Sequence, residues 1–346
     1  MAIFHRLLPR TLPACLRDLN DPAAKVRRSA IVDLARLVAQ QPTASMTEAL
    51  QKALGDEDPI VRTEAAYALG DAQATPALAS LLMAVDDEHA RVRQAAIESL
   101  GRIGDSRATS RLMRALRDDR PDVRFQAIIA LGRVAPADAR DALLDTARDP
   151  DSNVRYISVR VAEELCSAGQ QQVGSQLHLD DRLSAAAREW LSDEQPCVRL
   201  AAAILLARSG DLAGADCLLG AVAGRLRGVD PEDEATCVEI VGTLGLRDAM
   251  SDLERRAFGL KRWARECYSW QALVSLARMG HSRARDEILR DLRSWSRDRR
   301  TMAVAAAGKA RLSDALEIIE KMRGDESLAD PGAVDEALGQ LQASSS

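Results

Sequence analysis

Apolar residues recur along the chain with the period of an α-helix, and the same pattern returns at regular intervals. The segments DEDPIVRTEAAYALG, DDEHARVRQAAIESLG, DDRPDVRFQAIIALG and DPDSNVRYISVRVAEE share it. In each segment a Val precedes an Arg, and these four Arg residues lie 31 residues apart. Arg27 precedes the first of them by 35 residues and Arg199 follows the last by 44. Such self-similarity is typical of repeat proteins.

An Asp also stands six residues before each of these Arg residues. The six pairs are Asp21 and Arg27, Asp56 and Arg62, Asp87 and Arg93, Asp118 and Arg124, Asp149 and Arg155, and Asp193 and Arg199. Numbered from the Arg as zero, positions −1, +3, +4 and +7 lie on one side of a helix and carry mostly Val, Ala, aliphatic residues and Leu. We expect this side to form the core.

Each repeat is predicted to contain two helices. Pro59, Pro121 and Pro196 fit the first turn of the second helix, where no backbone donor is lost. Gly70, Gly101 and Gly132 are expected to end that helix. A helix pair of this kind cannot bury its apolar face alone, so neighbouring pairs must stack.

These repeats resemble the HEAT-repeat superfamily, in particular the short bacterial form known as PBS-lyase HEAT-like. The match is close over residues 15–210 and looser beyond. The resemblance implies an all-α fold, an α-solenoid (superhelix) of about ten two-helix repeats. It also implies that the Asp and Arg residues form a structural ladder between successive repeats, and that the second helices line the concave side.

The step of 44 residues before Arg199 includes a Gly- and Gln-rich stretch, SAGQQQVGSQLHLD. We interpret residues 167–180 as a loop or hinge. It would separate N-terminal repeats in residues 1–166 from more divergent repeats and a terminal cap in residues 181–346. In the second part the ladder spacing pairs Asp233 with Glu239, where Arg is expected, so no bridge is predicted there.

Positions +1 and +5 lie opposite the predicted core and form a stripe along the second helices. Three of the six Phe and Tyr residues of the chain fall on it. Rows of exposed aromatic and aliphatic side chains are typical of binding surfaces, although coverage by neighbouring elements would make them peripheral core. The predicted partner-binding groove comprises Arg28, Tyr67, Glu98, Phe125, Ile129, Tyr156 and Arg160; the other stripe positions are Val32, Thr63, Gln94, Leu200 and Ile204.

Residues 255–300 contain thirteen Arg or Lys and five Asp or Glu, although the whole chain has a net charge of −5. Trp263, Trp270 and Trp295 fall in this basic stretch. Basic residues interleaved with aromatics are typical of nucleic-acid surfaces, and some bacterial DNA glycosylases have HEAT-like folds. The candidate basic patch is Arg262, Arg265, Arg297 and Arg300. A solvated face with Trp residues in the core is the interpretation we favour.

Motifs for catalysis are missing from the sequence. The four His residues are scattered and form no His-Glu dipeptide, which the HEAT-like di-iron hydroxylases need, so no metal or other cofactor is expected. A nucleophile elbow, a P-loop and a dinucleotide-binding glycine motif are all lacking. The six Cys residues show no CxxC pairing and are expected to be reduced. Without an apolar run of roughly 20 residues, a membrane span is not expected and a cytoplasmic location is.

The function that these observations favour is a non-catalytic scaffold or adaptor that binds another protein along the concave groove. Nucleic-acid binding through the basic C-terminal half is the alternative, with a DNA-repair activity as its extension. The family takes its name from subunits that attach bilin chromophores to phycobiliproteins, so a bilin lyase-like role is a further alternative. The sequence does not identify the partner or the oligomeric state.

Overall fold

A computed structural model describes residues 10–41, 43–168, 177–259 and 266–343. Every element in these residues is a helix or a turn, as predicted, and the helices pack in sequential pairs. The chain divides into two compact units, residues 1–175 and 176–346. This boundary falls inside the segment 167–180 that the sequence marks as a loop, of which residues 169–176 lie outside the described residues.

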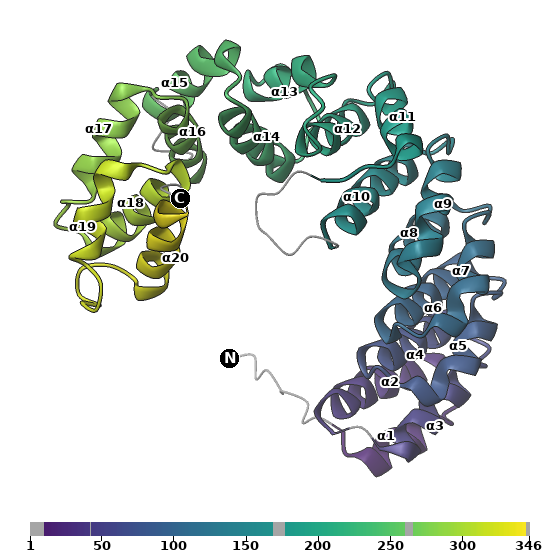
Figure 1. The fold of residues 1–346 in the computed structure, drawn as a ribbon. Helices are drawn as coiled ribbons and strands as arrows, with labels where there is room; N and C mark the ends of the chain where they lie inside the picture. Colours follow the sequence, from purple (N-terminus) through teal and green to yellow (C-terminus); the bar gives the residue numbers. More distant parts are fainter. Residues whose placement is uncertain (1–9, 42, 169–176, 260–265, 344–346) are drawn as a thin grey trace, which may run out of the picture. The chain divides into compact units, whose positions relative to one another are not determined.

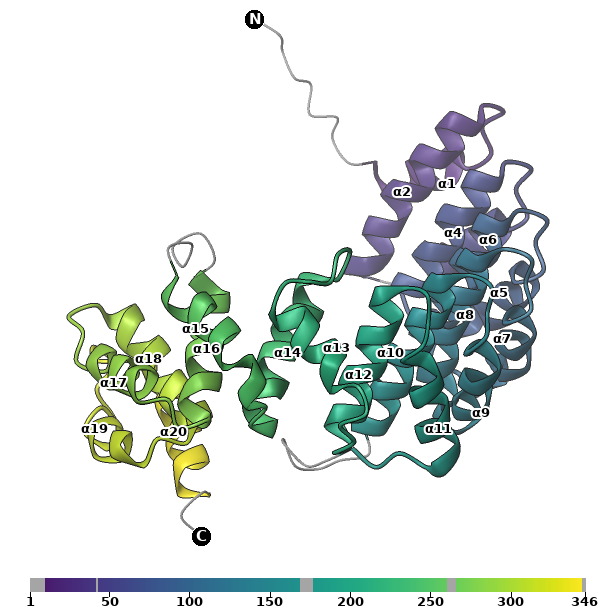
Figure 2. The same cartoon turned by 90° about the horizontal axis from the view of Figure 1, so that it is seen from above.

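Unit 1 contains ten α-helices over its described residues. They are α1 (Leu12–Asp18), α2 (Ala24–Gln40), α3 (Ala44–Ala53), α4 (Pro59–Asp71), α5 (Leu78–Ala84), α6 (Ala90–Ile103), α7 (Thr109–Ala115), α8 (Pro121–Val134), α9 (Pro136–Thr146) and α10 (Ser152–Ala168), with short 3-10 turns η1 (Thr75–Ala77) and η2 (Ser106–Ala108). The second helices α2, α4, α6, α8 and α10 lie side by side in one row, and the first helices form another row behind them (Figures 1 and 2). This stacking is that of a solenoid.

The core of unit 1 lies between the two rows, at the positions that the repeat predicts. Position −1 holds Val61, Val92 and Val123, all fully buried. The small residues at +3, from Ala30 to Ser158, are fully buried as well. Pro59 and Pro121 begin α4 and α8, and Pro196 begins a helix of unit 2, as expected of residues that need no backbone partner.

Our prediction that Gly70, Gly101 and Gly132 end the second helices is wrong. All three lie inside helices that continue to Asp71, Ile103 and Val134. A Cβ on Gly101 would lie 2.9 Å from Cα of Ala130, and one on Gly132 would lie 2.9 Å from Cγ1 of Val161. Gly101 is therefore required where α6 crosses α8 at close range, and Gly132 leaves room for the Val161 side chain. The left-handed residue that closes α6 is Gly104, with φ of 72°.

Unit 2 repeats this arrangement. Its helices are α11 (Asp181–Trp190), α12 (Pro196–Arg208), α13 (Ala215–Val222), α14 (Pro231–Leu244), α15 (Met250–Phe258), α16 (Glu266–Arg278), α17 (Ser282–Asp291), α18 (Arg297–Ala310), α19 (Leu316–Glu320) and α20 (Pro331–Gln342). The second helices from α12 to α20 again form a row. Gly242 of α14 meets Ser275 of α16, and Gly308 of α18 meets Ala337 of α20.

Those contacts fix the repeat phase that the sequence leaves open. In unit 1 the glycine at position +8 meets the residue at +6 of the next second helix, as Gly101 meets Ala130. Applied to the contact of Gly242 with Ser275, the same rule places Glu234 at position zero of α14 and Ser269 at position zero of α16. Position zero of α18 is Arg300.

Candidate partner-binding face

The Asp and Arg residues of unit 1 connect successive repeats. Arg62 donates from Nε and Nη2 to the two carboxylate oxygens of Asp87, over 2.7 and 2.9 Å. Its Nη1 donates over 2.8 Å to the backbone oxygen of Asp56, in its own repeat. Arg27, Arg93 and Arg124 form the same pair of bonds with Asp56, Asp118 and Asp149.

Four of the ladder Asp residues, Asp56, Asp87, Asp118 and Asp149, thus serve two repeats. The carboxylate of each accepts from the Arg of the preceding repeat, and its backbone oxygen accepts from the Arg of its own repeat. The backbone oxygen of Asp21 accepts from Arg27, that of Asp149 from Arg155 and that of Asp193 from Arg199. Bidentate Arg–carboxylate pairs are among the stronger hydrogen-bonded arrangements in proteins. The ladder therefore fixes the distance and the register between neighbouring second helices.

The ladder holds its carboxylates in the charged form. Burial acts to raise the pKa of Asp87, but the Arg62 guanidinium and the backbone N–H of His89 outweigh it and bring the pKa below its usual value. Burial likewise acts to raise the pKa of Asp56, but the hydrogen bond from Arg27 helps to bring that pKa below its usual value. Asp87 itself raises the pKa of Arg62. These groups remain ionised at neutral pH and are engaged within the fold.

The predicted stripe lies on the row of second helices, and we call it the second-helix face. It comprises Arg28 on α2, Tyr67 on α4, Glu98 on α6, Phe125 and Ile129 on α8, and Tyr156 and Arg160 on α10. All seven side chains are half-buried rather than fully exposed or fully buried. Tyr67 packs against the core of unit 1, and burial raises the pKa of its hydroxyl.

Other stripe positions differ from the prediction. Thr63 is buried, and its hydroxyl donates over 2.7 Å to the backbone oxygen of Pro59. Leu200 and Ile204 of unit 2 are fully buried and belong to the core there. The stripe is therefore a half-exposed surface only in unit 1, where Val32 adds a side chain that is 38% exposed.

The charged members of the second-helix face have partners within the protein. Arg28 pairs with Asp58, the residue that caps α4. Glu98 accepts from Arg102 over 2.7 Å, one turn farther along α6. Arg160 donates over 2.9 Å to Glu163 on α10. The aromatic and aliphatic members provide the apolar area of this face.

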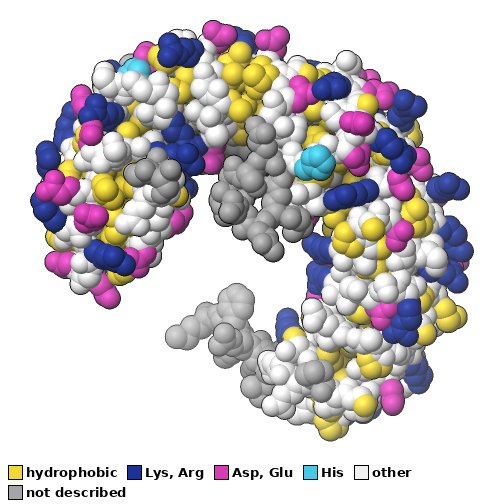
Figure 3. Space-filling model, viewed as in Figure 1, with side chains coloured by type: hydrophobic (Ala, Val, Ile, Leu, Met, Phe, Trp, Pro, Cys, Tyr) yellow, Lys and Arg dark blue, Asp and Glu magenta, His cyan; other side chains and the backbone are white. Residues whose placement is uncertain are grey.

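The candidate basic patch is only partly described. Arg262 and Arg265 lie outside the described residues, as does Trp263. Arg297 donates to the backbone oxygen of Glu326, and Arg300 donates to those of Ser294, Ser327 and Leu328. These bonds give both residues a structural role in tying α18 to neighbouring loops. On the face shown in Figure 3, basic and acidic side chains are interspersed in both units.

At one ladder position of unit 2, a carboxylate stands where unit 1 has an Arg. The sequence suggested Glu239 as the residue at the ladder position, but Glu234 occupies it, five residues earlier. Glu234 pairs with Arg256 of α15, and Arg256 also donates over 2.7 Å to the backbone oxygen of Val222, at the end of α13. A carboxylate at position zero thus pairs with a guanidinium on the next first helix. The prediction that Asp233 and Glu239 form no bridge concerns another pair and stays a prediction.

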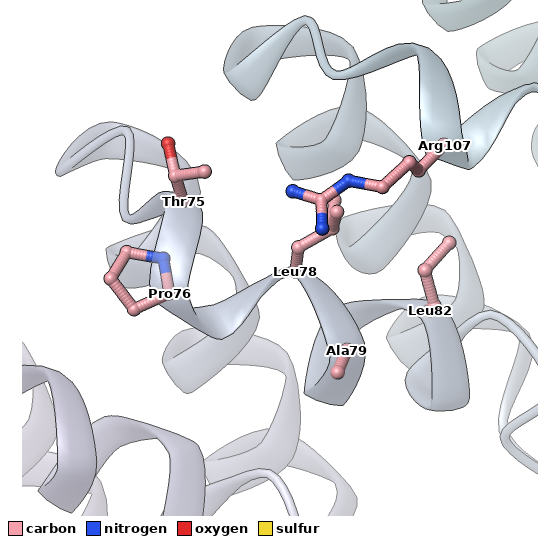
Figure 4. A pocket seen from close by; sticks show the side chains of 6 residues that line it. All are labelled: Thr75, Pro76, Leu78, Ala79, Leu82 and Arg107. Carbon is pink, nitrogen blue, oxygen red and sulfur yellow. The ribbon is translucent and has the colours of Figure 1, made fainter.

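The hollow in Figure 4 offers no catalytic group. It measures about 440 Å³ and is lined by Thr75, Pro76, Leu78, Ala79, Leu82 and Arg107, and the Arg107 side chain extends toward Leu78. Arg107 bonds to Asp105 and lowers the pKa of that carboxyl to about 2. The hollow lies on the first-helix side of unit 1.

Other reactive groups are isolated. Among the residues that the structure describes, no three His, Cys, Asp or Glu side chains are grouped to hold a metal ion. Cys15, Cys197, Cys217 and Cys237 are free thiols. Burial, with a smaller effect of Asp233, raises the pKa of Cys237, which makes that thiol a poor nucleophile. In the same described part of the chain, none of the helices is long and apolar enough to cross a membrane.

Part of the chain matches a known protein family. Residues 12–101 and 80–163 match the family described as HEAT repeats. Residues 12–163 are therefore HEAT repeats. No curated protein matches its sequence.

Several solved structures are similar to this chain. The complex of CpcE and CpcF of phycocyanin lyase from Nostoc sp. PCC7120 includes a chain with 19% identity and a TM-score of 0.43, over 70% of this chain and 92% of that one. An engineered protein has 15% identity and a TM-score of 0.49, over 95% and 98%. A chain in a structure of Kap95p with RanGDP has 13% identity and a TM-score of 0.56, over 96% of this chain and 52% of its own length. The last of these supports the solenoid fold, and none of them transfers an activity.

Proposed function

We propose that this protein is a non-catalytic scaffold and that unit 1 binds another protein through its second-helix face. The observation that carries the proposal is the set of half-buried apolar side chains on one row of helices, Tyr67 on α4, Phe125 and Ile129 on α8, and Tyr156 on α10. Large apolar side chains, aromatic ones above all, provide much of the binding energy at protein interfaces. HEAT repeats are typically found in protein-interaction scaffolds, which supports this choice.

Rigidity supports the same function. The ladder pairs and the close helix crossings at Gly101 and Gly132 fix the spacing of α6, α8 and α10. A surface whose side chains are already ordered loses little conformational entropy when a partner binds. The second-helix face can therefore hold an extended or helical segment with a modest contact area.

The experiment is affinity capture from the source cell with three baits. They are the wild type, a Phe125→Ala/Tyr156→Ala variant, and a Met83→Ala/Met113→Ala control. Met83 and Met113 are 76% and 38% exposed on the first helices of the same unit, so the control removes exposed apolar groups from the other row. Thermal melts of all three baits check that each variant remains folded.

We expect a protein that the wild type and the control recover and that the Phe125→Ala/Tyr156→Ala variant loses. With the purified partner, the affinity should fall at least about tenfold, the size expected for two interface anchors. Equal recovery by all three folded baits would show that the second-helix face is not the binding surface. Recovery of nucleic acid alone, removable by nuclease, would favour the alternative function in unit 2.

A further inference from the structure

Trp295 lies in the loop between α17 and α18 and is 94% exposed. The sequence suggested that the Trp residues of the basic stretch lie in the core, and for Trp295 this is wrong. Trp270 does pack partly against the core of unit 2, and Trp190 is 2% exposed. An indole left in water has a large apolar area that binding can bury.

The repeat explains what usually occupies this position. Trp295 stands five residues before Arg300, and the same position holds Glu57, Glu88 and Asp119 in unit 1. There the acidic side chain contacts the ladder Arg of the preceding repeat, for example Glu57 with Arg27 at 3.0 Å. The preceding position zero in unit 2 is Ser269, so no ladder Arg faces Trp295. The ladder therefore gives this side chain no structural role.

The loop that carries Trp295 also differs in charge from the loops of unit 1. The unit 1 loops carry acidic runs such as Asp56-Glu57-Asp58, whereas residues 294–296 read Ser-Trp-Ser. Arg293, Arg297 and Arg299 flank the indole and are exposed. The Arg293 side chain forms no hydrogen bond or ion pair with the residues described, and Arg299 contacts Asp291 at 3.3 Å. The loop thus presents an indole among positive charges.

The backbone of this loop is nevertheless held in place. Arg300 donates over 2.7 Å to the backbone oxygen of Ser294, the bond that every ladder Arg makes within its own repeat. Arg297 and Arg300 also bond to the backbone of residues 326–328. A fixed loop displays Trp295 with little further loss of entropy on binding.

We propose that Trp295 is the anchor of a second docking site, for a protein partner whose apolar recess accepts the indole and is rimmed by carboxylates. Charge complementarity with Arg293 and Arg299 selects such a rim. A nucleic acid fits less well. Arg297 and Arg300 already direct donors at backbone oxygens, which leaves fewer cations for a run of phosphates.

The test is a selection of random peptides displayed on phage against the whole chain, with wild type, Trp295→Ala and Leu212→Ala as targets. Leu212 is 48% exposed in the same unit and serves as the matched control. Selected peptides are then synthesised, and their affinities for the three targets are measured at low and high salt. A poly(dT) oligonucleotide is titrated in parallel.

We expect one group of peptides that the wild type and Leu212→Ala select and that Trp295→Ala does not. These peptides should carry net negative charge around an apolar residue. They should bind the wild type at least about tenfold more tightly than Trp295→Ala. Their affinity should fall as salt rises. If Trp295→Ala retains every group, or if the lost group is neutral or basic, the proposal is overturned. Binding of poly(dT) that depends on Trp295 would also overturn it, in favour of a nucleic-acid site. Because the site lies in unit 2, failure here leaves the proposed role of the second-helix face intact.

Discussion

Gly70 of α4 crosses Ser99 of α6 so closely that a Cβ on the glycine would lie 2.7 Å from the Cα of the serine. The Ser99 hydroxyl donates over 2.8 Å to the backbone oxygen of Ala66 at the same crossing. Gly242 and Ser275 repeat this arrangement in unit 2, where Ser275 donates to Val238. The absence of a side chain at position +8 therefore sets how near the second helices come, and hence the spacing of the second-helix face.

Substitution of Gly70 by Ala should destabilise unit 1 by about 1–3 kcal/mol, because the added methyl group forces two packed backbones apart. Urea unfolding measures this change. Gly339 is the matched control, since it lies inside α20 with open space around it, and Gly339→Ala should stabilise the protein by about 0.5–1 kcal/mol. Equal effects at the two positions would contradict the close-crossing argument.

The ladder gives a second prediction. Asp87→Asn should cost about 3 kcal/mol of unfolding free energy, because it removes the buried counter-charge of the Arg62 guanidinium and leaves only the exposed Glu88 beside it. Asp119 is the control, because its side chain is 81% exposed although it also contacts an Arg. Asp119→Asn should change the stability by less than about 0.5 kcal/mol. A small loss at Asp87 would show that the ladder contributes register rather than stability.

Acid should weaken unit 1. The pKa values of Asp56, Asp87 and Asp118 are lowered in the folded state, so their stabilisation is complete above the ordinary Asp value of about 3.9 and is lost as the pH falls through the lower folded values. Urea midpoints measured from pH 7 to pH 2.5 should fall steeply below about pH 4. The Asp87→Asn variant should show a shallower fall, and an unchanged slope would refute the assignment of Asp87.

Periodicity predicts the core because it depends only on local helix geometry. Val61, Ala65 and Leu69 are buried where the 3.6-residue period places them. The role of Gly70 was missed, since a glycine near a helix end reads as a cap and only the neighbouring helix shows the crossing. Glu234 was missed as well, because its partner Arg256 lies on a different element from the partners in unit 1.

For the candidate-site residues too, periodicity predicts some features and tertiary contacts decide the others. Phe125 and Tyr156 lie on the row of second helices that their positions indicate, but the internal partners of Arg28 and Arg160 depend on tertiary contacts. Trp295 was missed, although position −5 is acidic in four of the six repeats that share the Asp and Arg spacing. The signal required the phase of α18, which the sequence leaves open.

The reversed pair in unit 2 gives the last prediction. Arg256 holds three elements together, since it bonds to Glu234 of α14 and to the last carbonyls of α13 from its place on α15. Arg256→Ala should cost about 2–3 kcal/mol, because a partly buried carboxylate and two helix-end carbonyls lose their donor. Arg255→Ala is the matched control, one residue away with a side chain that is 67% exposed, and should be nearly neutral. Hydrogen exchange should show faster opening of α13 and α14 in Arg256→Ala, with α4 and α6 unchanged. If both variants exchange like the wild type, Glu234 does not take the place of the ladder in this repeat.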